Sequence, residues 1–418
     1  MDKKRLLKSL AITVLILSTI ATIAYFSVRN YSTSPIELEV WFTYEGGDII
    51  KEKIENFENL HPDISIKFHE QPSSGWVDKF VSIAQTGESP DVFLAKGSWF
   101  GELATLGYIY SLTDFIAPTL ESSFLPFSIT SLTYENELWG LPLWLDSILL
   151  FYNKDLFNQN GLEYPTANWT EIDLIFAAKN LTDLSETQRY GLAWSTLSPY
   201  MWPAFQYGYG HGPLYQNQTI IVNDTASVRA MEFIFKLKHN YTCVGYDDTS
   251  SAATQAFLES KASMLIYGGW FVPVLKDVGF NYGIEILPKI SSTSEFISPM
   301  AEVKGFGISK DTLHPETCFE LITYLTSTET QQELVNEEYK IPTKNDLILS
   351  STVQNNPDIK KQIEQISHSQ NFPLDPIYAI YSDYIRAALQ FILIDFHDIQ
   401  ETLNAAQQNI DANRGVDG

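Results

Sequence analysis

Hydrophobic and polar residues alternate at the start of the chain's folded part. The segment 36–42 places apolar side chains at every second position, which is the pattern of a β-strand. Gly46-Gly47 then turns the chain, Asp48 is placed to cap a helix, and apolar residues recur at helical spacing from 50 to 60. Segment 64–68 alternates again. A strand, a helix and a strand this close together predict a βαβ unit with parallel strands and a right-handed crossover.

The strand pattern, with an apolar residue at every second position, and the helical spacing of apolar residues both continue along the chain. Helices are expected over 75–86, 170–180, 226–239, 250–260, 315–326 and 328–337, and strands over 91–95, 190–194, 263–267 and 303–308. The region 198–215 is rich in Pro, Gly and aromatic residues and is expected to be a loop. Asp398-Ile-Gln-Glu401 is a capping box that opens the last helix. Helices and strands that alternate throughout predict an α/β fold.

Residues 1–35 have the character of a targeting segment and not of the fold. The basic start Lys3–Lys8 precedes the uncharged stretch Ser9–Ser27, whose length of roughly 18 residues approaches the ~20 that a bilayer core requires. By the positive-inside rule, the N-terminus stays in the cytoplasm and the bulk of the chain is exported. A small-residue cleavage pattern is poor, and no Cys before Cys243 could carry a lipid. We therefore expect an uncleaved membrane anchor in preference to a cleaved signal.

Composition and charge narrow the classes of ligand. The 418 residues suffice for two or three domains or for two lobes with a large core each. A net charge of −24 disfavours nucleic acid as a partner. Arginine is scarce, which disfavours an anionic ligand, because the Arg guanidinium is the group that most often binds carboxylate and phosphate through two parallel hydrogen bonds. The acidity suits solubility in an outside medium.

Cysteine and asparagine positions bear on export. Cys243 and Cys318 could pair in an exported protein, but two buried free thiols fit the sequence equally well. Five of the six Asn-X-Ser/Thr sequons fall within 168–240 and suggest a glycosylated outer surface. The sequons are at Asn30, Asn168, Asn180, Asn217, Asn223 and Asn240.

Seven motifs, in order along the chain, resemble those of extracellular solute-binding proteins of the maltose-binding type. They are Phe57-Glu-Asn-Leu-His-Pro-Asp-Ile-Ser-Ile; Gly87-Glu-Ser-Pro-Asp-Val; Leu138-Trp-Gly-Leu-Pro with Tyr152-Asn-Lys-Asp-Leu-Phe; Asn168-Trp-Thr-Glu; Lys261-Ala-Ser-Met with Gly269-Trp; Lys304-Gly-Phe-Gly-Ile-Ser-Lys; and Leu325-Thr-Ser-Thr-Glu-Thr-Gln with Ile341-Pro. Each motif alone is weak, but seven in register are specific.

The resemblance implies a two-lobed periplasmic-binding-protein fold of type II, with a hinged cleft between lobes that are each a mainly parallel sheet flanked by helices. Such proteins bind carbohydrate, usually as monomers without a cofactor or metal, and deliver it to the permease of an ABC importer. The implied lobes are 36–145 with 300–345, and 149–297 with 349–418. The implied hinge crossings are 145–149, 298–302 and 345–349.

Aromatic rings and carboxylates at predicted strand ends are the candidates for sugar contact. A sugar has an apolar face that stacks on rings and an edge of hydroxyls that polar groups bind. Ligands of open α/β sheets bind where strands end, and Glu45 and Trp99 each follow a predicted strand. Trp144 and Asp146 lie two residues apart in an extended segment, so they point to the same side. For each ring, packing in the core is the structural alternative.

The resemblance adds further candidates. It implies a stacking role for Trp270 and a sugar contact for Tyr200, and it assigns hydroxyl-binding acids to Glu45 and Asp146. The less specific candidates are Trp202, in the same loop as Tyr200, and Tyr378 and Tyr381, which precede a helix expected from Tyr384.

Other functions remain as alternatives. An enzyme would need positioned groups, yet the chain has no His-x-x-x-His pair, Gly-x-Ser-x-Gly elbow or P-loop. A glycosidase carboxylate pair stays open, since the chain has 51 acids. Tyr207, Tyr209 and His211 keep a ferric-ion ligand open, and acids with aromatics keep a polyamine open. A surface sensor or adhesin could use the same fold without transport.

Overall fold

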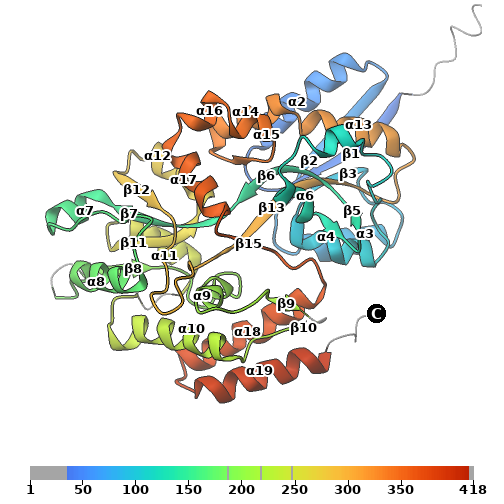
Figure 1. The fold of residues 1–418 in the computed structure, drawn as a ribbon. Helices are drawn as coiled ribbons and strands as arrows, with labels where there is room; N and C mark the ends of the chain where they lie inside the picture. Colours follow the sequence, from blue (N-terminus) through green and yellow to red (C-terminus); the bar gives the residue numbers. More distant parts are fainter. Residues whose placement is uncertain (1–34, 186–187, 217–218, 246–247, 414–418) are drawn as a thin grey trace, which may run out of the picture.

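The computed structural model describes residues 35–185, 188–216, 219–245 and 248–413. Over these ranges the chain forms two lobes, each built on one larger sheet with helices packed around it. Figure 1 shows the blue and teal strands β1, β2 and β3 in one lobe and the green and yellow strands β7, β8 and β11 in the other. The expected membrane anchor falls within residues 1–34 and lies outside the described residues. Across the described ranges, no helix has the length and apolar character that crossing a membrane requires.

The predicted βαβ unit opens lobe one. It consists of β1 (Ile36–Phe42), α2 (Gly47–Leu60) and β2 (Ile64–Glu70), and β1 pairs in parallel with both β2 and β3 (Val92–Lys96). The apolar stripe of α2 is buried as its spacing predicts, at Ile50, Ile54 and Phe57. The cap expected from Asp48 was wrong. Gly46 is the N-cap at φ 85°, a left-handed conformation that glycine adopts without strain, and Asp48 lies in the first turn.

The first sheet has the strand order β14-β6-β13-β3-β1-β2, and β15 also pairs with β13. Its remaining strands are β6 (Leu141–Asp146), β13 (Met300–Ile308), β14 (Ile341–Pro342) and β15 (Gln370–Asn371). The surrounding elements are α3 (Trp76–Ala84), α4 (Gly97–Thr105), α5 (Pro118–Glu121), α6 (Pro126–Thr130), β4 (Thr133–Tyr134), β5 (Glu137–Leu138), α13 (Pro315–Leu325) and α14 (Thr328–Glu338).

The second sheet has the order β12-β7-β11-β8. Its strands are β7 (Ile148–Asn153), β8 (Tyr190–Ala193), β11 (Ala262–Gly268) and β12 (Tyr282–Glu285). Lobe two also contains α7 (Lys154–Gln159), α8 (Glu171–Leu181), α9 (Trp202–Gly208), β9 (Tyr215–Gln216), β10 (Thr219–Ile220), α10 (Thr225–Phe235), the π-helical turn η1 (Lys236–Asn240), α11 (Ser250–Leu258), the 3₁₀ turn η2 (Gly269–Phe271) and α12 (Val272–Asp277).

The C-terminal part of the chain returns along both lobes. Short helices α15 (Asn345–Ile348) and α16 (Ser351–Gln354) lead into α17 (Pro357–Ile366), which contacts β14 of the first sheet and β7 and β12 of the second. Two long helices, α18 (Ile377–Leu393) and α19 (Ile399–Asn413), then pack against each other, and α19 packs on α10. In Figure 1 these red helices lie beside the yellow-green α10, although the two segments are far apart in sequence.

Several expectations about local structure need correction. Both sheets are mixed and not mainly parallel, because β13 runs antiparallel to β3 and β6, and β7 runs antiparallel to β11 and β12. The expected loop 198–215 contains the short helix α9. Tyr378 and Tyr381 lie inside α18 and do not precede it. By contrast, the capping side chain at Asp398 is confirmed, since it accepts a hydrogen bond from Glu401 N over 2.9 Å.

Each lobe has its own hydrophobic core. One core draws on residues from Leu38 to Leu145 and from Val303 to Ile341, and the other draws on residues from Ile148 to Met300 and from Phe372 to Ile410. Cys318 is buried in the first core and Cys243 in the second, and both thiols are free. The alternative in which the two cysteines pair is therefore excluded by their separation into different lobes.

The free thiols generate a test of the fold. A disulfide of this span would contribute about 2–5 kcal/mol to stability, so its reduction would lower the melting temperature. We expect dithiothreitol to leave the melting temperature unchanged. We also expect a thiol reagent to label Cys243 and Cys318 only after the chain unfolds, since both are buried. A melting temperature that falls on reduction would contradict the separation of the two cysteines.

Candidate functional site

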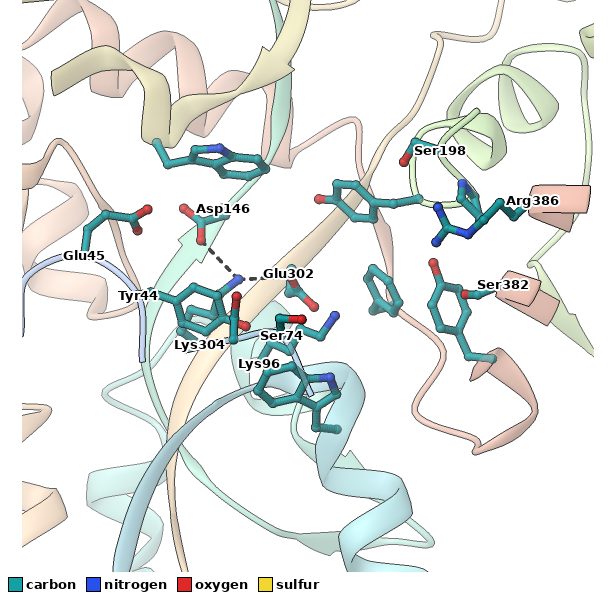
Figure 2. A pocket seen from close by; sticks show the side chains of 17 residues that line it. Tyr44, Glu45, Ser74, Lys96, Asp146, Ser198, Glu302, Lys304, Ser382 and Arg386 are labelled. Atoms are coloured by element: carbon teal, nitrogen blue, oxygen red, sulfur yellow. Dashed lines mark hydrogen bonds and ion pairs between the residues drawn. The ribbon is translucent and has the colours of Figure 1, made fainter. Parts of the chain in front are cut away.

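A cavity of about 470 Å³ lies between residues of the two lobes. This volume falls within the roughly 300–1,000 Å³ of small-molecule sites. Lobe one contributes Tyr44, Glu45, Ser73, Ser74, Lys96, Trp99, Asp146, Glu302 and Lys304. Lobe two contributes Ser198, Pro199, Tyr200, Trp270, Phe372, Tyr378, Ser382 and Arg386. Figure 2 shows these groups facing one another from separate elements, with Glu302 and Lys304 on one side and Ser198 and Arg386 on the other.

Most of the residues singled out from the sequence line this cavity. They are Glu45, Trp99, Asp146, Tyr200, Trp270 and Tyr378. Their positions come from strand ends, from η2 and from α18, which are far apart in sequence but meet between the lobes. The cavity thus combines flat rings with a small number of polar groups, the combination that a sugar requires.

Trp144, Trp202 and Tyr381 do not line the cavity. Trp144 is fully buried, and its Nε1 donates a hydrogen bond to Asp146 Oδ2 over 3.0 Å. Trp202 is buried in the core of lobe two, at the start of α9. The Tyr381 hydroxyl donates to the carbonyl oxygen of Pro199 over 3.0 Å, so Tyr381 supports the loop before Tyr200 from behind. The two-residue repeat of a β-strand correctly predicted that Trp144 and Asp146 lie on the same side of β6. The Trp144 ring is nevertheless covered by other residues and is fully buried.

A buried charged cluster forms the base of the cavity. The pairing of β6 with β13 sets Asp146 opposite Glu302, and Lys304 lies two residues further along β13. Lys304 Nζ is 2.9 Å from Glu302 Oε2 and 3.3 Å from Asp146 Oδ2 (Figure 2). Ser98 Oγ, at the start of α4, donates to Glu302 Oε1 over 3.1 Å. One ammonium group is therefore shared by two carboxylates from the two adjacent strands.

The cluster stays fully ionised. Burial alone would raise the pKa of Asp146, but Lys340 and Lys304 outweigh burial and hold that pKa below its usual value. Burial is likewise outweighed at Glu302, whose pKa is lowered by Lys304 and Lys96. Burial opposes the charge of Lys304, yet Glu302 and Asp146 raise its pKa. Both carboxylates are consequently hydrogen-bond acceptors across the neutral pH range.

Stacked rings cover the lobe-one side of the cavity. Tyr44 stacks on Trp99 with ring centroids 6.3 Å apart, and Trp99 stacks on the buried Trp76 at 4.9 Å. Lys96 Nζ lies 5.0 Å from the Trp99 ring and Lys304 Nζ lies 4.7 Å from the Tyr44 ring. The buried tryptophan therefore fixes the orientation of the two rings that face the cavity.

Two glycines position Trp270 on the opposite side. It lies in η2, directly after β11, where the sequence is Gly268-Gly269-Trp270. A Cβ at Gly268 would lie 2.2 Å from the Trp270 ring, and a Cβ at Gly269 would lie 1.9 Å from Gln362 Oε1. A side chain at Gly268 would displace the Trp270 ring itself, and one at Gly269 would require Gln362 to move, so this dipeptide lets the indole fold back over the end of the strand.

A second aromatic group completes the lobe-two side. Tyr200 stacks on Phe372 at 5.7 Å, and Phe372 meets Tyr378 edge-on at 4.5 Å. The Tyr200 hydroxyl donates to the carbonyl oxygen of Met300 over 3.1 Å, which ties the loop to β13. Burial raises the pKa of Tyr200 well above its usual range, so its hydroxyl stays a donor.

Glu45 lies at the rim of the cavity, where its side chain is about half exposed. Its Oε2 is 2.9 Å from Nζ of Lys340, an ammonium that is almost fully buried. Lys340 Nζ also lies 5.2 Å from the Trp144 ring. The acid therefore has a partner in lobe one and keeps one oxygen toward solvent.

Sequence reasoning missed several residues of the cavity. Tyr44, Lys96, Glu302, Lys304, Phe372 and Arg386 were not among the candidates. One signal was available, because Glu302 and Lys304 are charged residues in a strand that is otherwise apolar. Such charges are rarely buried without a partner, so their positions in an apolar strand predict an ion pair. The low number of arginines also gave no indication that Arg386 lines the cavity.

The described residues contain no group of three or more His, Cys, Asp or Glu side chains that could hold a metal. The candidates for a ferric ion are engaged elsewhere. His211 Nδ1 lies 2.8 Å from Asp224 Oδ2, and the Tyr207 hydroxyl accepts a hydrogen bond from Leu214 N over 3.1 Å. The structure thus does not bring this tyrosine–histidine set to the cavity between the lobes.

The shared lysine generates a prediction about stability. Lys304→Met leaves Asp146 and Glu302 buried without their cation, and breaking a buried pair in this way costs about 3–5 kcal/mol at pH 7. In the native protein both carboxylates have lowered pKa values, so they stabilise the fold above about pH 4 and lose that contribution as the pH falls. In the variant they take up protons more readily. The cost should therefore shrink from pH 7 to pH 4 in urea titrations.

Lys67→Met is the matched control, because Lys67 pairs with Glu37 at 2.9 Å on the surface, where both side chains are more than half exposed. Exposed pairs contribute little, so this variant should unfold like the native protein. Equal effects of the two substitutions would contradict the role assigned to Lys304.

Comparison with known proteins places the chain in a family. Residues 43–332 match the family model described as bacterial extracellular solute-binding protein. The galactooligosaccharide-binding protein of Bacillus subtilis is 25% identical over 91% of this chain and 90% of its own length. The maltotriose-binding protein of Pyrococcus abyssi is 21% identical over 89% of this chain and 81% of its own length.

Solved structures show the same fold. The maltose/maltodextrin-binding domain MalE from Bdellovibrio bacteriovorus, bound to maltotriose, superposes with a TM-score of 0.80 at 23% identity and covers 90% of this chain and 99% of its own. A substrate-binding protein from Listeria monocytogenes in complex with cycloalternan gives 0.81 at 20% identity, with coverage of 91% and 99%. These solved structures therefore share the two-lobed fold of this chain. The family match spans more than half of the sequence, and the chain belongs to the bacterial extracellular solute-binding proteins.

Proposed function

We propose that this protein is the substrate-binding subunit of an ABC importer and that it captures an oligosaccharide between its two lobes. One observation carries the proposal: a cavity with stacked rings on both sides and two ionised acceptors at its base. Rings suit the apolar faces of a sugar, and carboxylates suit its hydroxyls. Relatives named for galactooligosaccharide and maltotriose support this class of ligand.

Closure of the lobes is the proposed mechanism. The lining residues come from both lobes, so a ligand makes all of its contacts only when the lobes approach. The ligand therefore binds the closed form more tightly than the open form and shifts the protein toward the closed form. A dissociation constant near 1 μM, or about 8 kcal/mol, would suffice for capture. The proposed lobes are 36–145 with 300–345 and 149–297 with 349–418, and the proposed hinge crossings are 145–149, 298–302 and 345–349.

The proposed location is outside the cytoplasmic membrane, in keeping with an extracellular family. The uncharged stretch Ser9–Ser27 would anchor the chain there and keep it near a permease. Three sequons, at Asn168, Asn180 and Asn240, are on exposed positions, which is compatible with glycosylation. We further propose that the protein acts as a monomer.

We propose that the site binds sugar without cleaving it. A glycosidase requires one carboxylic acid that stays protonated, with a raised pKa, to act as the general acid. Asp146 and Glu302 share Lys304, and both have lowered pKa values. Neither acid therefore has the proton that cleavage needs. Incubation with labelled oligosaccharides should return them intact.

Trp270 provides the test of sugar binding. Trp270→Ala removes a ring that lines the cavity, and we expect affinity for the sugar to fall by more than ~1 kcal/mol while the melting temperature of the free protein stays close to the native value. A thermal-shift screen of galacto-oligosaccharides and α-1,4-linked glucose oligomers would first identify the ligand, since binding to the folded form raises the melting temperature. Calorimetry then measures the affinity.

Phe176→Ala is the matched control, because Phe176 is an aromatic residue of α8 that is 59% exposed and does not line the cavity. Its affinity should equal that of the native protein. Unchanged affinity in Trp270→Ala would remove Trp270 from the site, and a screen without any sugar hit would overturn the proposed ligand class.

A further inference from the structure

The segment 370–375 crosses one end of the cavity and is held by both lobes. Gln370 N donates to the carbonyl oxygen of Pro299 over 2.9 Å, and β15 pairs with β13. On the side of lobe one, Ser131 Oγ donates to Asn371 Oδ1 over 3.2 Å. On the side of lobe two, the Tyr215 hydroxyl donates to Asp375 Oδ2 over 2.6 Å. The segment is therefore fixed at both ends.

A close backbone contact holds the middle of this segment against lobe one. A Cβ at Gly101 of α4 would lie only 1.7 Å from the carbonyl oxygen of Leu374, so the helix backbone packs directly on the segment. Any side chain at position 101 would push Leu374 away. Glycine here permits the segment to lie flat against α4.

Phe372 is the residue of this segment that faces the cavity. Phe372 lines the cavity of about 470 Å³ between the lobes, and it also lines a second cavity of about 500 Å³. It is 5% exposed and is clamped between Tyr200 and Tyr378. Among the residues that the structure describes, no other lines both cavities. Phe372 thus borders two spaces of similar size.

The second cavity, like the first, combines aromatic rings with carboxylates. Its rings are those of Tyr134, Tyr207 and Tyr215, and its acids are Glu135 and Asp375. Tyr134 and Glu135 come from the β4–β5 turn of lobe one, whereas the other three residues belong to the chain of lobe two. Rings with a few acceptors, supplied by both lobes, suit further sugar units as well as the first cavity does.

We propose that Phe372 sets the length of the bound oligosaccharide by ending the cavity. The proposal rests on the proposed carbohydrate ligand. The end unit of the sugar chain abuts the Phe372 ring, so each added unit contributes affinity only until the chain reaches this wall. Without the ring, the chain continues into the second cavity and stacks on the tyrosines there. Phe372 is thereby a specificity-determining residue, distinct from the rings that stack on the sugar faces.

The test is a length series. Affinities for α-1,4-linked glucose oligomers and for galacto-oligosaccharides of one to six units are measured by calorimetry on the native protein, Phe372→Ala and Phe372→Leu. In the native protein the affinity should stop rising at an intermediate length. In Phe372→Ala it should continue to rise, so the ratio of longest-chain to shortest-chain affinity grows threefold or more. Phe372→Leu keeps part of the side chain, so its affinity ratio should lie between those of the native protein and Phe372→Ala. This variant also provides the test if Phe372→Ala fails to fold.

Tyr134→Ala identifies where the extra units bind. Combined with Phe372→Ala, it should cancel the gain for long chains, whereas alone it should leave the native length profile unchanged. A loss of long-chain affinity in Tyr134→Ala alone would overturn the proposal, because the second cavity would then already hold sugar in the native protein.

The length series distinguishes the carbohydrate function from the role of Phe372. A native protein that binds none of the sugars overturns the carbohydrate function and this inference with it. A native protein that binds sugar, with a length ratio that changes less than threefold in both Phe372 variants, overturns the role of Phe372 alone.

Discussion

The site depends on one ammonium group shared by two carboxylates. Lys304 lies within 3.3 Å of both Asp146 and Glu302, at the ends of β6 and β13 that approach the second lobe. Each carboxylate alone would be costly to bury, and the two together would repel each other. With Lys304 between them both stay ionised, and the strands carry two fixed acceptors to the base of the cavity. The same contact joins two chain segments that are more than 150 residues apart.

Fixed acceptors need fixed rings beside them. Trp76 is buried and holds Trp99, which holds Tyr44, and the ammonium of Lys304 lies near the face of Tyr44. The charged cluster and the ring stack therefore support each other within lobe one. On lobe two, Trp270 depends on a pair of glycines and on the end of β11. The long side chains of Lys304 and Glu302 are already held by burial and ion pairing, so little of their conformational entropy remains to be lost when a ligand is bound.

The sequence predicted the fold better than it predicted the site. Periodicity located the first βαβ unit because α2 and its strands use local patterns. It also put Trp144 and Asp146 on one side of a strand, but period two does not say what covers that side, and the ring of Trp144 proved to be buried. Lys304 was missed because its partners are set by the pairing of β6 with β13. Phe372 was missed because the segment 370–375 shows neither the helix nor the strand repeat of apolar residues, so the sequence gives no indication of which side chains face the cavity.

The position of the charged cluster has a consequence for the proposed closure. Asp146 and Glu302 lie within two of the three proposed crossings, 145–149 and 298–302, so they lie close to the axis about which the lobes would turn. Groups near an axis move little during a rotation. Trp270 is also near a crossing, because Gly269 N donates to the carbonyl oxygen of Ser147 over 3.0 Å, whereas Tyr378 belongs to α18, which packs mainly on α19 and β10 and would move more. The acceptors would then stay in register with the sugar hydroxyls while the rings carried by α18 close over its faces. Such a division lets lobe one select the ligand before closure, and lets stacking on lobe two supply the affinity that only the closed form has.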